Sequence, residues 1–156
     1  MDDAFNIVNL FFDSAQKYPD KIAIIDKDSM ITFSQLEKQV KRTSAYFLKK
    51  GIVKGDRVMI FVPMSIDLYR IVLALVSIGA TAVFLDEWVS KKRMEACCKV
   101  AQCKAFIGIF KARVFSVFSS ELRKIPIKLG VSYPVISSSK DAETKVYKLD
   151  TALITF

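Results

Sequence analysis

The side chains of this chain most capable of chemistry are three cysteines, and the chain contains no histidine. A thiolate serves as a nucleophile or zinc ligand when a histidine or cation stabilises it. Cys97 and Cys98 share helical spacing with Met94 and Ala101, and Cys103 follows shortly after. Because buried cysteine behaves as a small hydrophobic residue, we interpret these residues as core. A reactive thiol and a metal site are the alternatives.

Two carboxylates, Asp86 and Glu87, follow a predicted buried strand. Open α/β sheets bind ligands at the carboxyl ends of their strands, which would give Asp86 a direct functional role. An aspartate there also often begins a turn or caps the next element, which is the alternative. The glycines form neither GxGxxG nor GxxxxGK[ST], and without histidine no Ser-His-Asp or Cys-His arrangement exists. The residues alone therefore predict no catalytic residue, no metal site and no assigned cofactor-binding residue.

The composition predicts a compact globular domain, because 52% of the 156 residues are apolar and 26% are charged. The Lys and Arg residues behind the net charge of +8 are scattered through nearly every segment. Such an excess weakly attracts nucleotides, phosphates and anionic membranes. Without a basic stripe or groove-reading motif, we expect no nucleic-acid partner. The odd number of cysteines argues against a disulfide framework and favours a reducing cytoplasm.

No secretory signal is expected, because the acidic residues 1–3 are not followed by an apolar segment with a cleavage site. The longest uncharged stretch, Ile71 to Leu85, is about five residues short of a typical membrane span. Gly79 interrupts it. We interpret the stretch as a buried helix followed by a buried strand, with no membrane span.

The elements that would position these residues begin with a helix that Asn6 caps and that ends at 18–20, followed by a hairpin of 22–25 and 30–32. Thr32 and Gln35 have capping-box spacing for the next helix, which ends at Gly51. Buried β-branched strands then alternate with helices, which is typical of parallel βαβ units. These are strands 57–62, 81–85 and 105–109 with helices 66–78 and 90–101. Weaker signals predict a helix over 114–122 and strands over 125–131, 134–137 and 151–156. The predicted fold class is α/β, a mostly parallel sheet with flanking helices and an N-terminal β-hairpin.

An ordered series of short segments resembles the adenylate-forming (AMP-binding) enzymes of the acyl-CoA synthetase type. The family patterns P-D-K-x-A, L-[TS]-Y-x-E-L, G-[IV]-x-x-G-D-x-V and L-K-A-G-x-x-x-V-P-[IL]-D correspond to residues 19–23, 31–36, 51–58 and 76–86. The last departs from its pattern, with Ser77 in place of lysine and Phe84 in place of proline. Residues 150–156 resemble the strand that runs into the family's T-S-G-[ST]-T-G phosphate loop. By this resemblance, Thr155 and Phe156 lead into that loop.

The resemblance implies that residues 1–156 are the N-terminal part of the large N-terminal domain. The phosphate loop and the C-terminal domain with its catalytic lysine would lie beyond residue 156. Intact relatives use ATP and Mg²⁺ to convert a carboxylic (fatty) acid into acyl-AMP and pyrophosphate, then commonly pass the acyl group to CoA or another acceptor. The chain alone is therefore expected to be inactive and to bind no cofactor, with the remainder of the ligase as its partner.

Two further expectations concern the branch and the assembly. Residues 104–112 and 123–128 resemble the branch that contains the β-lactone synthetases of olefin biosynthesis, whose members are also described as fatty-acid-CoA ligases. Unpaired sheet edges and exposed apolar faces would favour self-association. The alternative to a ligase segment is a stand-alone, doubly wound α/β binding or regulatory domain.

Overall fold

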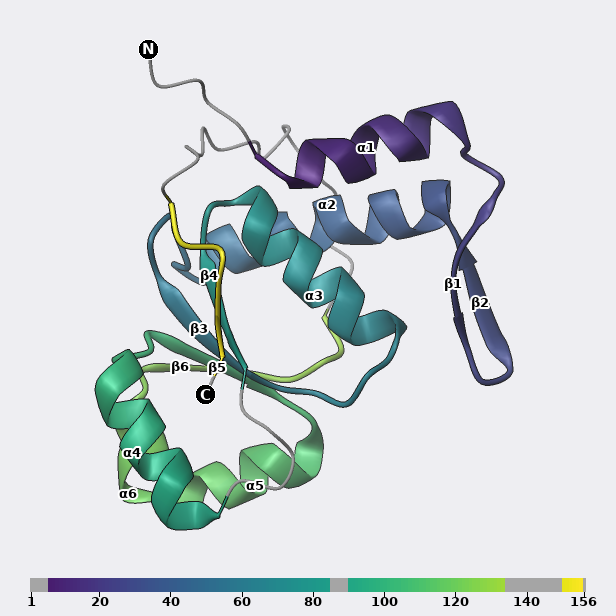
Figure 1. The fold of residues 1–156 in the computed structure, drawn as a ribbon. Helices are drawn as coiled ribbons and strands as arrows, with labels where there is room; N and C mark the ends of the chain where they lie inside the picture. The colour runs from purple at the N-terminus through teal and green to yellow at the C-terminus, as the bar shows by residue number, and fades with distance from the viewer. Residues whose placement is uncertain (1–5, 85–89, 134–149, 156) are drawn as a thin grey trace.

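The computed structural model describes residues 6–84, 90–133 and 150–155, and Figure 1 shows their arrangement. A five-stranded sheet in the order β6-β5-β3-β4-β7 lies between two layers of helices, and a two-stranded hairpin stands beside it. Among the described residues, all pairings in the large sheet are parallel, and the hairpin is antiparallel. The predicted α/β class, with a mostly parallel sheet, flanking helices and an N-terminal hairpin, is confirmed.

The chain enters through α1 (Val8–Lys17) and the hairpin strands β1 (Ile22–Asp26) and β2 (Ser29–Thr32). The predicted capping role of Asn6 is only partly right, because Ile7 directly precedes the helix and has no side-chain cap. The Asn6 side-chain oxygen accepts a hydrogen bond from the Val8 amide at 3.1 Å, and its Nδ2 donates to the Val76 carbonyl at 3.0 Å. This buried amide therefore links the start of α1 to a distant helix.

The predicted capping box at the start of α2 (Phe33–Lys49) is confirmed. The Thr32 hydroxyl accepts from the Gln35 amide at 3.3 Å, and the Gln35 side chain accepts from the Thr32 amide at 3.1 Å. Gly51 follows the helix with a φ of +84°, a left-handed conformation that favours glycine. Thr32 and Gln35 at the start of α2 and Gly51 after its end therefore define the helix, as predicted.

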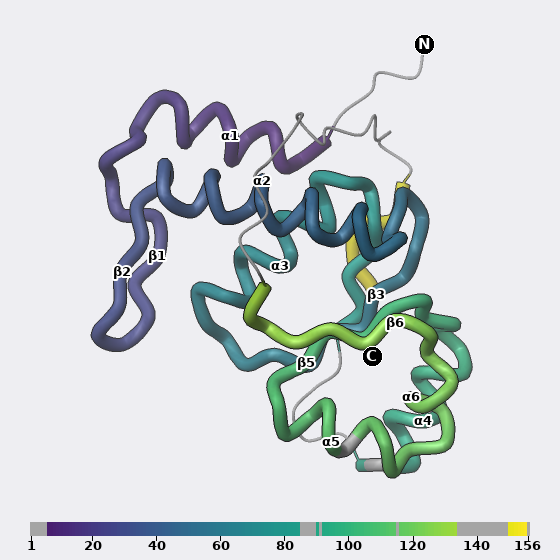
Figure 2. The backbone as a smooth tube through the Cα atoms, turned by 180° about the vertical axis from the view of Figure 1, so that it is seen from behind, coloured from purple at the N-terminus to yellow at the C-terminus, as the bar shows by residue number. Residues whose placement is uncertain are grey.

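The rest of the chain alternates strands and helices. In order, these are β3 (Arg57–Phe61), α3 (Ile66–Ser77), β4 (Thr81–Phe84), α4 (Lys91–Ala101), β5 (Ala105–Gly108), α5 (Phe110–Phe118), α6 (Ser120–Lys124), β6 (Ile127–Leu129) and β7 (Leu153–Thr155). Helices α1, α2 and α3 lie on one face of the sheet and α4, α5 and α6 on the other (Figures 1 and 2). The stretch after Ile71 is thus a helix followed by a buried strand, as expected. Within the ranges described above, no helix is long and apolar enough to cross a membrane.

Alternate residues of the central strands pack into two separate hydrophobic cores, one on each face of the sheet. Val58 and Ile60 of β3 pack with α2 and α3, whereas Met59 between them packs with the α4–α6 layer. Because side chains alternate across a strand and both faces are covered, the central strands are apolar at nearly every position. This explains why their sequences read as continuous apolar runs.

The predicted helix over 114–122 is wrong, because two helices, α5 and α6, occupy this region. Ser119 separates them in an extended conformation, with φ −98° and ψ 126°. Its hydroxyl accepts from the Leu122 amide at 3.4 Å and donates to Glu95 at 3.0 Å. A serine that caps a new helix competes with continuation of the old one, which is the physical reason for the break.

The predicted C-terminal strands are shorter than expected. Strand β6 begins only after Pro126, which has no amide hydrogen to donate to a neighbouring strand. The last strand begins at Leu153 rather than at residue 151 and is described as far as Thr155, and Phe156 lies outside the described residues. The predicted strand over 134–137 lies outside the described residues.

Candidate functional site

The carboxyl edge of the sheet is the candidate site, because ligands of open parallel sheets bind there. The β3 and β5 strands lie side by side, yet β3 leads to α3 on one face and β5 leads to α5 on the other. The connections therefore separate to opposite faces at this edge. Thr155, the last described residue of β7, pairs with Phe84 at the end of β4. Thr155 thus lies at the carboxyl edge, whereas Phe156 lies outside the described residues.

Three contacts hold the segment that contains β7 against the body of the sheet. The Lys54 ammonium lies 2.7 Å from an Asp150 carboxylate oxygen. The Thr81 hydroxyl donates to the Thr151 carbonyl at 2.6 Å. The Ala82 amide donates to the Ala152 carbonyl at 2.9 Å. Because both Thr81 and Ala82 belong to β4, the two residues just before β7 already fix its register against that strand.

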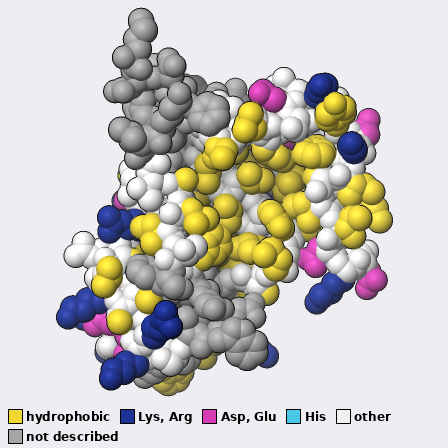
Figure 3. Space-filling view, viewed as in Figure 1, with side chains coloured by type: hydrophobic (Ala, Val, Ile, Leu, Met, Phe, Trp, Pro, Cys, Tyr) yellow, Lys and Arg dark blue, Asp and Glu magenta, His cyan; other side chains and the backbone are white. Residues whose placement is uncertain are grey.

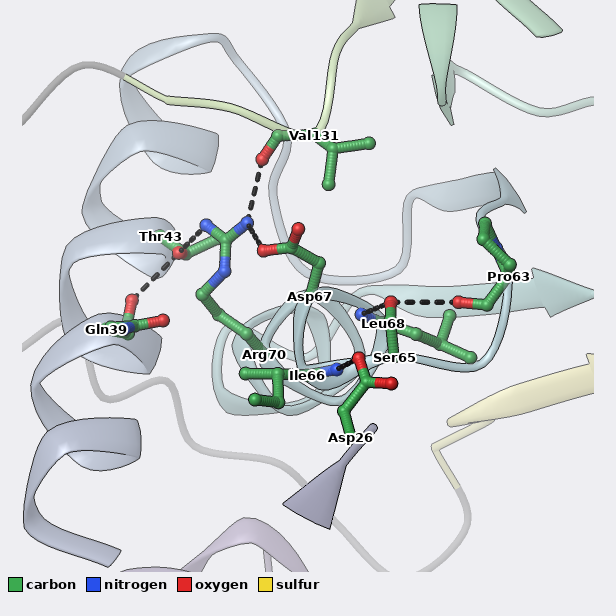
Figure 4. Close-up of polar contacts among 10 residues, drawn as sticks. All are labelled: Asp26, Gln39, Thr43, Pro63, Ser65, Ile66, Asp67, Leu68, Arg70 and Val131. Carbon is green, nitrogen blue, oxygen red and sulfur yellow. Dashed lines mark hydrogen bonds and ion pairs between the residues drawn. The ribbon is translucent and has the colours of Figure 1, made fainter. Parts of the chain in front are cut away.

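The N-terminus of α3 also lies near the carboxyl edge, but side chains of this chain already accept hydrogen bonds from two of its first amides (Figure 4). Ser65 accepts from the Leu68 amide at 3.3 Å and donates to the Pro63 carbonyl at 2.9 Å. The Asp26 carboxylate, which comes from the hairpin, accepts from the Ile66 amide at 3.3 Å. A helix N-terminus attracts anions, and here the chain supplies its own. This terminus is therefore a structural junction rather than a phosphate site.

A buried arginine, which the sequence reasoning missed, connects α3 to two distant segments (Figure 4). Arg70 is 8% exposed, and its guanidinium donates to the Thr43 hydroxyl of α2 at 3.0 Å. It also donates to Asp67 at 2.6 Å and to the Val131 carbonyl at 2.7 Å. These partners satisfy a charge that would be costly to bury alone, so the network is structural. The sequence feature that could have indicated a buried arginine is its position directly before the uncharged stretch that begins at Ile71.

The predicted core role of the cysteine face is confirmed. Cys97, Cys98 and Cys103 are buried free thiols that pack with Met59 against the sheet. Burial raises the pKa of the Cys98 thiol to about 12 and that of the Cys103 thiol to about 11. A thiol that stays protonated is a poor nucleophile. Among the described residues, no group of His, Cys, Asp or Glu could hold a metal ion.

The carboxylates Asp86 and Glu87 lie outside the described residues, so their role stays a prediction. Phe84, which replaces the proline of the family pattern, is the last residue of β4 and pairs with Ile60 of β3 as well as with Thr155. Phe84 therefore extends the strand between its two neighbours.

Comparison with known proteins identifies the family. A family model described as AMP-binding enzyme matches residues 11–152. The chain belongs to the AMP-binding enzyme family. The match includes the segments at 19–23, 31–36 and 51–58, and the prediction that they form the opening part of the family's large N-terminal domain stays a prediction. The comparisons do not test the olefin-pathway branch, which stays a prediction.

The relatives of this family segment include ligases. The chain is 30% identical over 99 residues to the 2,3-dihydroxybenzoate-AMP ligase of Bacillus subtilis, a match that covers 64% of this chain and 18% of the ligase. Its fold is similar to a mutant form of coronafacic acid ligase from Pectobacterium brasiliense, with a TM-score of 0.82, 21% identity, and coverage of 97% of this chain and 33% of that one. It also resembles the N-terminal subdomain of NpsA from Klebsiella oxytoca, with a TM-score of 0.78, 23% identity, and coverage of 95% and 37%. Several curated relatives are matched over only 3% to 18% of their length, so the chain corresponds to part of each.

Proposed function

We propose that this chain is the scaffold on which an ATP-dependent acyl-adenylating ligase holds its phosphate-binding loop. The observation that carries the proposal is the placement of β7 beside β4, with Thr155 at the carboxyl edge of the sheet. A segment that continued from Thr155 would begin at the edge where parallel sheets bind ligands. The family, and relatives described as acid ligases, support the same role.

The reaction proposed for the whole ligase joins a carboxylate to the α-phosphate of ATP with release of pyrophosphate. The acyl group of the resulting acyl-AMP then passes to a thiol such as CoA, with AMP as the leaving group. Developing charge on phosphate is stabilised by preorganised amides and cations. Two observations on the described residues support a nucleotide site elsewhere: they contain no group of three or more acidic, Cys or His residues for a metal, and Asp26 and Ser65 accept from the Ile66 and Leu68 amides of α3. We therefore assign nucleotide binding and catalysis to segments that follow Thr155.

A broad apolar area supports the remainder of the ligase as the partner of this chain. Figure 3 shows hydrophobic side chains gathered over α1, the hairpin and α3. Leu10 is 58% exposed, Ile25 70% and Met64 72%. Apolar areas of this kind mark surfaces that another folded unit covers. In the isolated chain they, together with the edge strands β6 and β7, would favour self-association, which light scattering can measure.

The test is an ATP–pyrophosphate exchange assay with aryl, medium-chain and long-chain carboxylic acids. A longer protein that continues past Phe156 in the same reading frame is expected to give acid-dependent exchange, and the 156-residue chain is expected to stay at the blank. Each reaction without acid is the control. Exchange by the 156-residue chain well above its blank would show that this chain contains the catalytic machinery, and the proposal would be wrong. Absence of exchange by the longer protein with every acid would also count against it.

A further inference from the structure

The net charge of the chain is concentrated in one layer of the fold. Residues 91–128 contain ten basic and two acidic residues, whereas the rest of the chain contains fourteen of each. The net charge of +8 thus comes from the segment that forms α4, β5, α5, α6 and most of β6. Basic residues occur in nearly every segment, as predicted. The prediction that the net charge is also spread along the chain is wrong. The reason is that acidic residues are scarce in this one segment.

Most of these cations face solvent. Helices α4, α5 and α6 pack into one layer, and Figure 3 shows Lys and Arg side chains gathered over it. Six of the side chains are exposed and form no ion pair with any described residue: Lys92, Arg93, Lys99, Lys111, Arg113 and Arg123. Their charge therefore remains available to an anionic partner.

The same layer exposes an apolar helix face. Phe110 is 77% exposed, Val114 45% and Val117 59%. Their spacing of four and three residues places them on one side of α5. The small residues Ala112 and Ser116 are buried on the other side. A surface helix normally turns its large apolar residues inward, and these described side chains of α5 have the reverse arrangement.

Charge distinguishes this face from the apolar area over α1, the hairpin and α3. That area lies within residues 1–90, which contain eleven basic and eleven acidic residues. A neutral apolar surface suits contact with more protein, whereas a layer that exposes both apolar side chains and an excess of Lys and Arg suits the boundary between water and anionic lipid. Long basic side chains reach lipid phosphates while apolar ones enter the acyl region.

We propose that the α4–α6 layer docks on an anionic membrane surface, with α5 lying in the plane of the lipid headgroups. Phe110, Val114 and Val117 enter the boundary of the acyl chains, and Lys92, Arg93 and Lys111 contact the headgroup phosphates. A duplex nucleic acid would satisfy the cations but would leave the apolar face of α5 in water. The inference does not depend on the proposed ligase activity, and its test involves no nucleotide.

Co-sedimentation of the 156-residue chain with lipid vesicles tests the proposal. Vesicles of phosphatidylcholine with about one-third phosphatidylglycerol are expected to bind the chain at least about tenfold more strongly than phosphatidylcholine alone, because each basic residue near the surface adds to the attraction. Raising salt from about 0.1 M to about 1 M shortens the Debye length from about 10 Å to about 3 Å and should release most of the protein. Equal binding to both vesicles, or no binding to either, would overturn the proposal.

Two pairs of variants separate the layer from the rest of the surface. Lys92→Glu with Lys111→Glu should weaken binding at least about tenfold, and the acidic residues would favour the first turns of α4 and α5, so folding is retained. Phe110→Ser with Val117→Ser should weaken binding to a similar degree. The matched controls are Lys38→Glu with Arg42→Glu on α2, and Leu10→Ser with Met64→Ser in the neutral area. Thermal melting confirms that each variant is folded.

Three outcomes would assign the surface to something else. Controls that weaken vesicle binding as much as the α5 variants would show a diffuse attraction. Tighter binding to duplex DNA than to vesicles, unaffected by Phe110→Ser with Val117→Ser, would indicate a nucleic-acid surface. An acidic protein partner would be indicated by two results together: soluble polyglutamate displaces the chain from vesicles, and the Phe110→Ser substitution does not change vesicle binding. Each of these results contradicts the membrane proposal.

Discussion

The guanidinium of Arg70 lies 4.9 Å from the centroid of the Tyr133 ring. That ring lies 4.7 Å from the ring of Tyr46 and 5.4 Å from the ring of Phe47, both in α2. Burial raises the pKa of the Tyr133 hydroxyl above its ordinary range. Arg70 of α3 thus holds the segment after β6 against α2 through its hydrogen bond to the Val131 carbonyl and its contact with the Tyr133 ring.

The first prediction concerns this arginine. Arg70→Ala should lower the free energy of unfolding by about 3 kcal/mol, because the Thr43 hydroxyl and the Val131 carbonyl lose a buried partner. Arg70→Lys should recover only part of the loss, since an ammonium cannot reach several acceptors in a planar fork. Urea denaturation measures both values.

Two controls test the interpretation. Arg42→Ala on the exposed side of α2 should change stability by less than about 0.5 kcal/mol. Tyr133→Phe should be neutral or stabilising, because no described residue hydrogen-bonds to this buried hydroxyl. An Arg70→Ala variant as stable as Arg42→Ala would show that the network contributes nothing.

The second prediction concerns the attachment of β7. Thr81→Val removes the hydroxyl that donates to the Thr151 carbonyl while it keeps the shape of the side chain. The expected cost is about 1 kcal/mol, felt mainly as faster amide exchange in Leu153–Thr155. Thr151→Val is the control, because its backbone carbonyl remains. Hydrogen exchange that rises equally in β3 would show global destabilisation instead of local release.

The third prediction concerns the close approach of β5 and α5 at Gly108. A Cβ at Gly108 would lie 2.9 Å from ring atoms of Phe106 and 3.1 Å from the Cβ of Ala112. Gly108→Ala should therefore destabilise the protein by about 1–3 kcal/mol through overpacking. At Gly130 the added carbon would meet only the mobile end of the Arg113 side chain, at 3.1 Å, so Gly130→Ala should be tolerated. Similar melting temperatures for the two variants would contradict this reasoning.

The fourth prediction concerns the buried thiols and pH. Burial holds the pKa of Cys98 at about 12, against 9.0 for the unperturbed thiol. The folded state keeps its proton between these values while the unfolded state releases it, so this group makes stability fall as pH rises from 9 to about 12 and has no effect below that window. Cys98→Ala should flatten this alkaline fall. Denaturation at several pH values measures the slope, and an unchanged slope would exclude Cys98 as its source.

A companion measurement is thiol labelling near neutral pH. The three cysteines should react with an aromatic disulfide reagent far more slowly in the folded chain than in denaturant, because they are buried and protonated. Rapid labelling of the folded chain would contradict the assignment of these residues to the core.

Local chemistry in the sequence was enough to predict much of the fold. The Thr32 and Gln35 capping box, the glycine after α2, the hairpin, and the alternation of apolar strands with helices depend on neighbours within a few residues. The apolar face around Cys97 and Cys98 followed from helical spacing in the same way. The break at Ser119 was missed because a serine can continue a helix or cap a new one, and here the cap is stabilised by a contact with the distant Glu95 that the local sequence does not show.

Long-range relationships were decided only by the tertiary structure. The sequence by itself determined the family's segments, the α/β class and the core role of the cysteines, since each depends on residue type and short spacing. Sheet order placed Thr155 beside Phe84, and helix packing gave Arg70 its partners in α2 and after β6. The concentration of charge was visible in the sequence, but the exposure of Phe110 and Val117 among those cations required the packed layer. Burial and pairing across 27 to 61 residues of chain depend on how the layers close on one another, and no local pattern encodes that.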